Sequence, residues 1–265
     1  PIVRRGEKTN FQYEAFSGLK GYEVLDEIES RLQPVIKETE ALLDAKPVVP
    51  GVYEVICSPK VSGLIAHEAF GHGVEMDMFV KKRAKALEYI DKPVASTIVN
   101  MHDGARSATQ VSSFLFDDEG ILGTDTKIID NGILKAGISD LLSAFKLNTS
   151  PTGNGKRESF ERKGYARMTN TFFTAGNDSL DDMIASIKYG YLLDNYTSGM
   201  EDPRNWGIQC VILYGQEIKD GKFTGKLISP VIMTGYVPDL LKSITMISND
   251  DIELSGSGMC GKGHK

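Results

Sequence analysis

The amino-acid sequence predicts an α+β protein, with mostly antiparallel sheets, flanking helices and one helix that breaks at a glycine-rich turn. Strand-like segments closed by Asn-Gly or Asp-Gly turns alternate with segments of helical periodicity. There is no fixed-period repeat, and no low-complexity linker divides the 265 residues. We therefore expect one intertwined unit over residues 1–265 rather than two separable domains.

The first part of the chain is predicted to contain two helices with a strand between them. Residues 17–46 place apolar side chains at helical spacing, which predicts an amphipathic helix with a kink near Pro34. Residues 52–58 are rich in β-branched side chains and predict a strand. Ser58 and Pro59 then form a helix start, with serine as the N-cap and proline at the first helical position. The helix that begins there carries two histidines.

The remainder of the chain reads as strands and turns with two further helices. Residues 95–104 and 111–120 are predicted strands, and residues 127–139 are a predicted hairpin that turns at Asn131-Gly132. The other predicted elements are a helix at 180–193, a hairpin at 207–235 turning at Asp220-Gly221, and a short helix at 237–247.

Composition disfavours several classes of protein. A net charge of -6 argues against a nucleic-acid binder, which needs a basic face, and no apolar run approaches the roughly 20 residues of a membrane span. Three cysteines are too few, and odd in number, for a disulfide framework. The first residues, PIVRRGEKTN, lack both an initiator methionine and the apolar core of a signal peptide. We expect a processed chain or a fragment, located in the cytoplasm.

The stretch GLIAHEAFGHGVEMD contains the most informative residues, His67, Glu68 and His72. Residues four apart on a regular helix lie about 40° apart around the axis, but residues five apart lie about 140° apart. His67 and His72 can therefore share a metal only if the helix breaks locally. Gly71 and Gly73 favour a widened π-type turn or a helix end at this point. The alternative is that both histidines are simply solvated or core residues.

A cysteine near the end of the chain favours the metal site. Cys260 lies between glycines in GSGMCGKGHK, whereas Cys57 and Cys210 lie in predicted strands, where a cysteine acts as a small core residue. Two histidines and one thiolate form a known zinc ligand set that leaves a fourth position for water. Glu68, next to one of these histidines, is then placed as the general base.

A second candidate feature is the loop TGNGKRES, in which residues Gly153–Arg157 combine glycines with two cations. Lys156 and Arg157 could hold a peptide carboxylate or a phosphate. The loop is not a phosphate-binding P-loop, because it lacks the Gly-Lys-Ser/Thr ending at the required spacing. A basic, solvated loop is the alternative interpretation.

Four other residues have a functional and a structural interpretation. His264 is the second choice for the third ligand, and His102 is interpreted as a turn residue rather than a ligand. Glu75 and Asp77 either orient a ligand histidine or belong to a solvated polar face.

The segments HEAFGHGVE, SPTGNGKRES, RMTNTFF and GMCGKG occur in an order that resembles the TldD/PmbA family, and specifically its metal-bearing TldD-type members. The resemblance runs from about residue 48 to residue 263. It implies a cytoplasmic zinc metallopeptidase that hydrolyses peptide bonds in unstructured peptides. By position, His67, His72 and Cys260 would be zinc ligands and Glu68 the catalytic base.

The resemblance also implies an assembly and a longer chain. Family members form homodimers, or heterodimers with a PmbA/TldE-type subunit that lacks the metal motif. They also have an amino-terminal lobe that is absent here, so residues 1–265 are expected to be the single carboxy-terminal catalytic region of a longer metalloprotease. The family pattern places Tyr165 and Arg167 near the site as possible oxyanion stabilisers. The alternatives are a non-catalytic PmbA-like partner or regulatory subunit, and a zinc hydrolase acting on a non-peptide amide.

Overall fold

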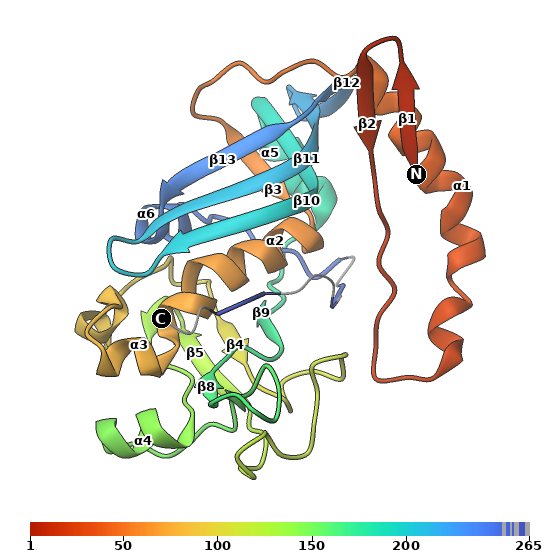
Figure 1. The fold of residues 1–265 in the computed structure, drawn as a ribbon. Coiled ribbons are helices and arrows are strands. Elements are labelled where there is room, and N and C mark those ends of the chain that lie inside the picture. The colour runs from red at the N-terminus through yellow and green to blue at the C-terminus, as the bar shows by residue number, and fades with distance from the viewer. Residues whose placement is uncertain (251–252, 255, 257–259, 263–265) are drawn as a thin grey trace.

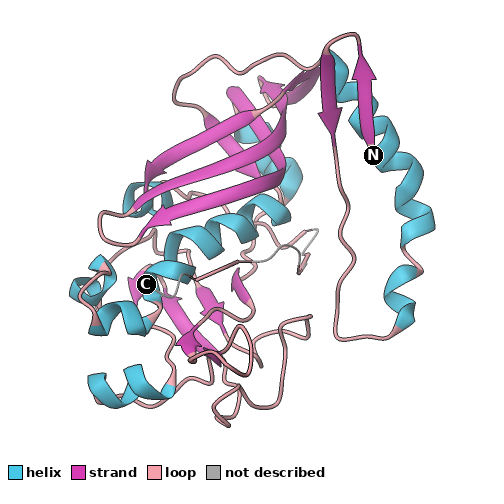
Figure 2. Cartoon of the chain, viewed as in Figure 1, coloured by secondary structure: helices cyan, strands magenta, loops and turns pink. Residues whose placement is uncertain are grey.

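The computed structural model describes the chain except for residues 251–252, 255, 257–259 and 263–265 (Figure 1). The described residues form helices and mostly antiparallel sheets, as predicted (Figure 2). The larger sheet has the strand order β12-β11-β10-β3, with β13 also paired to β11. Its strands are β3 (Glu54–Cys57), β10 (Tyr189–Asp202), β11 (Gly207–Lys219), β12 (Lys222–Ile228) and β13 (Val231–Tyr236).

The smaller sheet has the order β6-β5-β4-β9 and leaves β9 at one edge. Its strands are β4 (Met101–Asp103), β5 (Thr126–Asp130), β6 (Ile133–Leu134) and β9 (Thr171–Phe173). Both predicted hairpin turns form with the left-handed backbone that they require: φ is 47° and 80° at Asn131-Gly132, and 47° and 74° at Asp220-Gly221. Short-range turn chemistry therefore sets these two strand registers.

Helix α2 (Pro59–Ala66) packs against strands of both sheets, and Figure 1 shows it lying along the larger one. Ser58 caps the helix as predicted, because its side chain accepts a hydrogen bond from the Val61 N–H at 3.4 Å. The main hydrophobic core includes Val61 of α2, Ile128 of the smaller sheet and Ile212 of the larger one, all fully buried. Burial on both sides holds α2 and the turn that follows it in a fixed position.

The amino-terminal segment forms an arm beside this core (Figure 1). It consists of β1 (Ile2–Arg5), β2 (Lys8–Phe11), a 3₁₀ turn (η1, Tyr22–Leu25), α1 (Ile28–Ala41) and a second 3₁₀ turn (η2, Leu42–Asp44). The predicted helix at 17–46 was therefore too long at its start. Pro34 lies inside α1, as expected, but Val35 and Thr39 are the only buried residues of the helix. Ile28 and Leu32 are exposed.

Three other predicted elements differ from the structure. Residues 111–120 form no strand, because Asp117 instead accepts hydrogen bonds from nearby backbone N–H groups. The strand at 95–104 shortens to β4. The helix at 180–193 stops at α5 (Leu180–Ser186), and the apolar residues that follow enter β10, where both faces are covered. The helix at 237–247 shortens to α6 (Val237–Lys242).

The remaining elements come after α2 in the chain. They are a π-helical turn (η3, His67–Gly71), 3₁₀ turns (η4, His72–Val74; η5, Lys85–Tyr89), α3 (Met76–Val80), α4 (Leu141–Leu147), β7 (Gly155–Lys156) and β8 (Tyr165–Ala166). Within the described part of the chain, no helix is both long and apolar enough to cross a membrane.

Candidate metal centre

The helix that carries the histidines widens at the predicted place. Beyond α2 the backbone forms one π-helical turn, in which the His72 N–H bonds to the carbonyl of His67, five residues earlier. This widening turns the two imidazoles toward each other, with ring centroids 4.8 Å apart and ring planes at 85°. Gly71 packs closely here, since a Cβ atom built at this position would lie 2.1 Å from Met168 Sδ.

The third predicted ligand comes from the far end of the chain. Cys260 Sγ lies 3.1 Å from His72 Nε2, although 188 positions separate the two residues. One ligand atom from each of His67, His72 and Cys260 falls within a group no wider than 4.8 Å. That width is close to the span that one zinc ion, with bonds of about 2.0–2.3 Å, can bridge. The runner-up ligand, His264, lies outside the described residues.

A buried ionic network holds the cysteine segment against the histidine segment. Glu75, 2 % exposed, pairs with Arg167 through Oε1 at 2.7 Å and with Lys262 through Oε2 at 2.7 Å. Arg167 also donates to the Cys260 carbonyl at 2.9 Å, and Lys262 pairs with Asp77 Oδ1 at 2.5 Å. Glu75 and Asp77 therefore lie in a buried network rather than on a solvated face. Sequence reasoning missed Lys262, and its only signal was its position two residues after Cys260.

The three prospective ligands also interact electrostatically. Hydrogen bonds from His67 and then His72 lower the pKa of the Cys260 thiol to about 5. Burial by itself lowers the pKa of His72, but its bonds to Cys260 and Glu75 outweigh this effect and raise the pKa to about 10. Without a metal, the pair is therefore a thiolate beside an imidazolium at neutral pH. The thiolate is the form of cysteine that binds a metal.

Glu68 lies one residue from the first histidine but outside the group of ligand atoms. Its side chain, 6 % exposed, packs over Gly199 of β10, where an added Cβ would come within 2.5 Å of Glu68 Cγ. Burial raises the pKa of Glu68, although the nearby His67 and His72 lower it. A carboxylate with a raised pKa, beside a metal ligand and facing a cavity, can accept a proton from water.

Sequence reasoning also missed a second buried carboxyl group, Glu201 on β10. Neither of its oxygens has a hydrogen-bond partner among the described residues, and Oε1 lies 2.8 Å from the place where a Cβ of Gly73 would be. Burial, followed by repulsion from Glu68, raises the pKa of Glu201 to about 9 although His72 opposes it. Glu201 is therefore a neutral acid beside the histidine segment. No local sequence pattern marks it.

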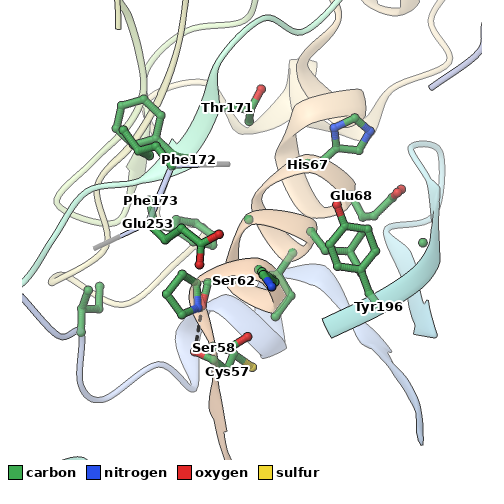
Figure 3. Close-up of a pocket in the computed structure, with 18 of the residues that line it drawn as sticks. Cys57, Ser58, Ser62, His67, Glu68, Thr171, Phe172, Phe173, Tyr196 and Glu253 are labelled. Carbon is green, nitrogen blue, oxygen red and sulfur yellow. Dashed lines mark hydrogen bonds between the residues drawn. The ribbon is translucent and has the colours of Figure 1, made fainter. Parts of the chain in front are cut away.

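A cavity of about 1240 Å³ opens beside these groups (Figure 3). His67, Glu68 and Cys260 contribute to its wall, together with the edge strand β9 and Tyr196 of β10. Figure 3 shows Glu68 and Tyr196 on one side and Phe172 and Phe173 of β9 on the other. The prospective metal site is therefore accessible from a space large enough for a short length of extended chain.

The other predicted residues are distributed around this centre. His102 is in β4 rather than in a turn, with Nδ1 2.7 Å from Asp125 Oδ1. Cys57 and Cys210 lie in β3 and β11, where burial raises the pKa of each thiol to about 12. Tyr165 has the ammonium of Lys163 5.1 Å from its ring centre. These residues are not part of the group of ligand atoms.

Comparison with known proteins finds a matching family model and several relatives. The family model described as the PmbA/TldA metallopeptidase C-terminal domain matches residues 50–262. A metalloprotease TldD homolog from Buchnera aphidicola is 34 % identical over 215 residues, which are 80 % of this chain and 44 % of that protein. A zinc metalloprotease TldD homolog from Saccharolobus solfataricus is 32 % identical over 264 residues, which are 98 % of this chain and 58 % of that protein.

A solved structure shares the fold. TldE from Thermococcus kodakarensis superposes with a TM-score of 0.74 at 22 % identity, covering 93 % of this chain and 55 % of that one. The chain thus spans about half the length of the curated relatives and of this structure.

Proposed function

This chain belongs to the family of the PmbA/TldA metallopeptidase C-terminal domain, and from that premise we propose that residues 1–265 are the catalytic region of a longer zinc-dependent metallopeptidase. The observation that carries the proposal is the convergence of His67, His72 and Cys260 on one point. Two of these residues, His67 and Cys260, line one cavity together with Glu68. The name of the Saccharolobus relative, a zinc metalloprotease, supports zinc as the metal.

The donor atoms suit zinc, because imidazole nitrogen and thiolate sulfur are its usual ligands and three protein ligands leave a position open. Bound there, zinc would polarise the scissile carbonyl and lower the pKa of a water toward about 7. Glu68 accepts the proton of the attacking water and passes it to the leaving amine. Its raised pKa makes it a better proton acceptor than an exposed glutamate. Arg167, engaged with Glu75 and Cys260, positions the cysteine segment.

The substrate proposed for this site is an unstructured peptide. The cavity lies between an edge strand and α2, where an extended chain can enter but a folded domain cannot. The proposed assembly is a cytoplasmic dimer, formed either by two copies of this protein or with a PmbA/TldE-type subunit such as the TldE whose fold this chain shares.

Zinc analysis combined with a peptidase assay tests the proposal. The purified protein should contain stoichiometric zinc and cleave an unstructured peptide, as measured by mass spectrometry. Chelation should abolish cleavage, and zinc should restore it. A protein without zinc affinity would instead be a non-catalytic subunit. A zinc protein that hydrolyses other amides but no peptide would be a different class of hydrolase.

A further inference from the structure

The two cations of the Gly153–Arg157 loop face different parts of the surface. Strand β7 (Gly155–Lys156) pairs with β8, and Arg157 follows directly after the strand. Lys156 lines the large cavity together with Cys260 and Glu68. Arg157 lines a separate surface hollow with Asp118 and Phe160. Only the first of these cations is placed to meet a molecule bound at the prospective metal site.

Lys156 has no ionic partner within the described residues. It is half-buried, its ammonium lies 5.4 Å from the centre of the Phe114 ring, and no carboxylate oxygen of that part of the chain forms a salt bridge with it. Asp103 and Asp118 are near enough to act on Lys156 through their charges. The Asp103 oxygens already accept hydrogen bonds from Asn154, Thr169 and Thr171, and Asp118 Oδ2 accepts one from the Arg157 N–H. A half-buried ammonium without a counter-ion is costly, and an anionic ligand would remove that cost.

A second cation adds positive potential to the same wall of the cavity. Arg167 interacts electrostatically with Lys156 and also lines the cavity. The charge of Arg167 is shared with Glu75 at 2.7 Å, whereas the charge of Lys156 is not shared. Arg167 contacts the Cys260 carbonyl, so this positive region begins at the metal-binding segment itself.

We propose that Lys156 binds a carboxylate of the peptide substrate and so favours substrates that carry a negative charge on this side of the scissile bond. The inference rests on the proposed peptidase function. The ligand chemistry is a carboxylate, supplied either by the free carboxy terminus of the peptide or by an Asp or Glu side chain.

The loop backbone argues against a phosphate as the ligand. Phosphate sites in glycine-rich loops use several free backbone N–H groups. Here the Gly155 N–H donates to Asp117 at 2.8 Å, and the Arg157 N–H donates to Asp118 at 2.7 Å. The loop therefore offers one side-chain cation rather than a ring of amide donors, which suits a carboxylate.

Binding measurements on a Glu68→Gln protein, which removes the proposed base, test the site without turnover. The probes are fluorescent peptides of Gly, Ser and Ala with a free carboxy terminus, with a terminal amide, or with a terminal amide and one internal Glu. One or both carboxylate peptides should bind about tenfold more tightly than the peptide with only a terminal amide. The peptide that binds more tightly shows whether the carboxylate comes from the carboxy terminus or from the Glu side chain. Lys156→Met, which keeps the aliphatic length over Phe114, should abolish that preference. Lys156→Arg should retain most of it.

The neighbouring residue supplies a matched control. Arg157→Gln removes one positive charge from the same loop and should leave the preference unchanged. Equal affinity for carboxylate and amide peptides, or no measurable binding of any of them, would overturn the proposal. A preference that Lys156→Met leaves intact would assign the carboxylate to another residue and overturn it as well. If the preference is present but the unmodified enzyme cleaves no peptide, the proposed peptidase function fails while the binding site stands.

Discussion

The ammonium of Lys262 lies 2.7 Å from Glu75 Oε2, and through this contact the segment that carries Cys260 is attached to the segment that carries His72. Both side chains are largely buried, with 14 % of the Lys262 side-chain surface and 3 % of the Glu75 side-chain surface exposed, so solvent screens the pair weakly. The pair lies behind the prospective ligands rather than among them. Together with the hydrogen bond from Arg167 to the Cys260 carbonyl, it therefore holds a residue from the end of the chain at the metal site.

Lys262→Met should weaken zinc binding about 10–100-fold, which is the usual cost of losing a residue that supports a metal ligand. Competition with a chromophoric chelator measures the affinity. Lys81→Met is the matched control, because Lys81 pairs with Asp77 at 3.0 Å but, among the described residues, forms no ion pair with Glu75 and no hydrogen bond with the Cys260 segment. Equal zinc affinity in the Lys262→Met protein and its parent would show that the cysteine segment is held by other contacts.

Glu68→Gln should retain zinc and lose about 10²–10⁴-fold in turnover, because an amide cannot accept the proton of the attacking water. The carboxylate is not part of the group of ligand atoms, so the metal should be unaffected. Metal content and kcat are measured on the same preparation. Loss of zinc together with activity would instead identify Glu68 as a ligand.

Cys260→Ser should weaken zinc binding by more than about 100-fold, because a neutral hydroxyl replaces an anionic sulfur ligand. This loss exceeds the usual cost of removing a residue that supports a ligand without binding the metal. Cobalt substitution adds a spectroscopic test, since the sulfur-to-cobalt absorption should be lost in this variant. Cys57→Ser should preserve both metal content and that absorption. An unaltered affinity in the Cys260→Ser protein would direct attention to His264 or to a carboxylate.

In chelator-treated protein, iodoacetamide should modify Cys260 at pH 7 and spare Cys57 and Cys210. The pKa of Cys260, about 5, is below this pH and leaves a reactive thiolate, whereas pKa values of about 12 keep the other two cysteines as thiols. The rate should fall as the pH drops through about 5, where the thiolate gains a proton. Peptide mass mapping identifies the site, and zinc should protect it. Similar labelling of all three cysteines would contradict this electrostatic picture.

The isolated chain should self-associate through its amino-terminal arm. Leu25 of η1 and Ile28 and Leu32 of α1 are 48 %, 39 % and 50 % exposed, which is unfavourable unless another surface covers them. Light scattering should show a mass that rises with concentration. Leu32→Glu should reduce the rise, while Leu142→Glu, at a residue 44 % exposed on α4, should not. A concentration-independent monomer mass would exclude this interface.

Much of the local geometry follows from neighbouring residues in the sequence. The cap at Ser58 and the hairpin turns at Asn131-Gly132 and Asp220-Gly221 depend on the conformational preferences of a few adjacent residues, so they could be predicted. The need for a widened turn between His67 and His72 follows from helix geometry alone. Cys260 was identifiable as the partner of the two histidines because it is a thiol in a glycine-rich segment and not in a strand.

Other features depended on contacts between residues far apart in the chain. Residues 187–193 look helical by themselves, yet β3 and β11 recruit the later part of that segment into β10, because sheet pairing and burial outweigh local propensity. The pairing of Glu75 with Lys262, the buried carboxyl of Glu201 and the separation of Lys156 from Arg157 all require the tertiary arrangement. The sequence by itself determined the turns, the caps and the chemical types of the prospective ligands, since these depend on adjacent atoms. Only the folded structure decided which charges meet and which face the cavity, because those interactions act through space.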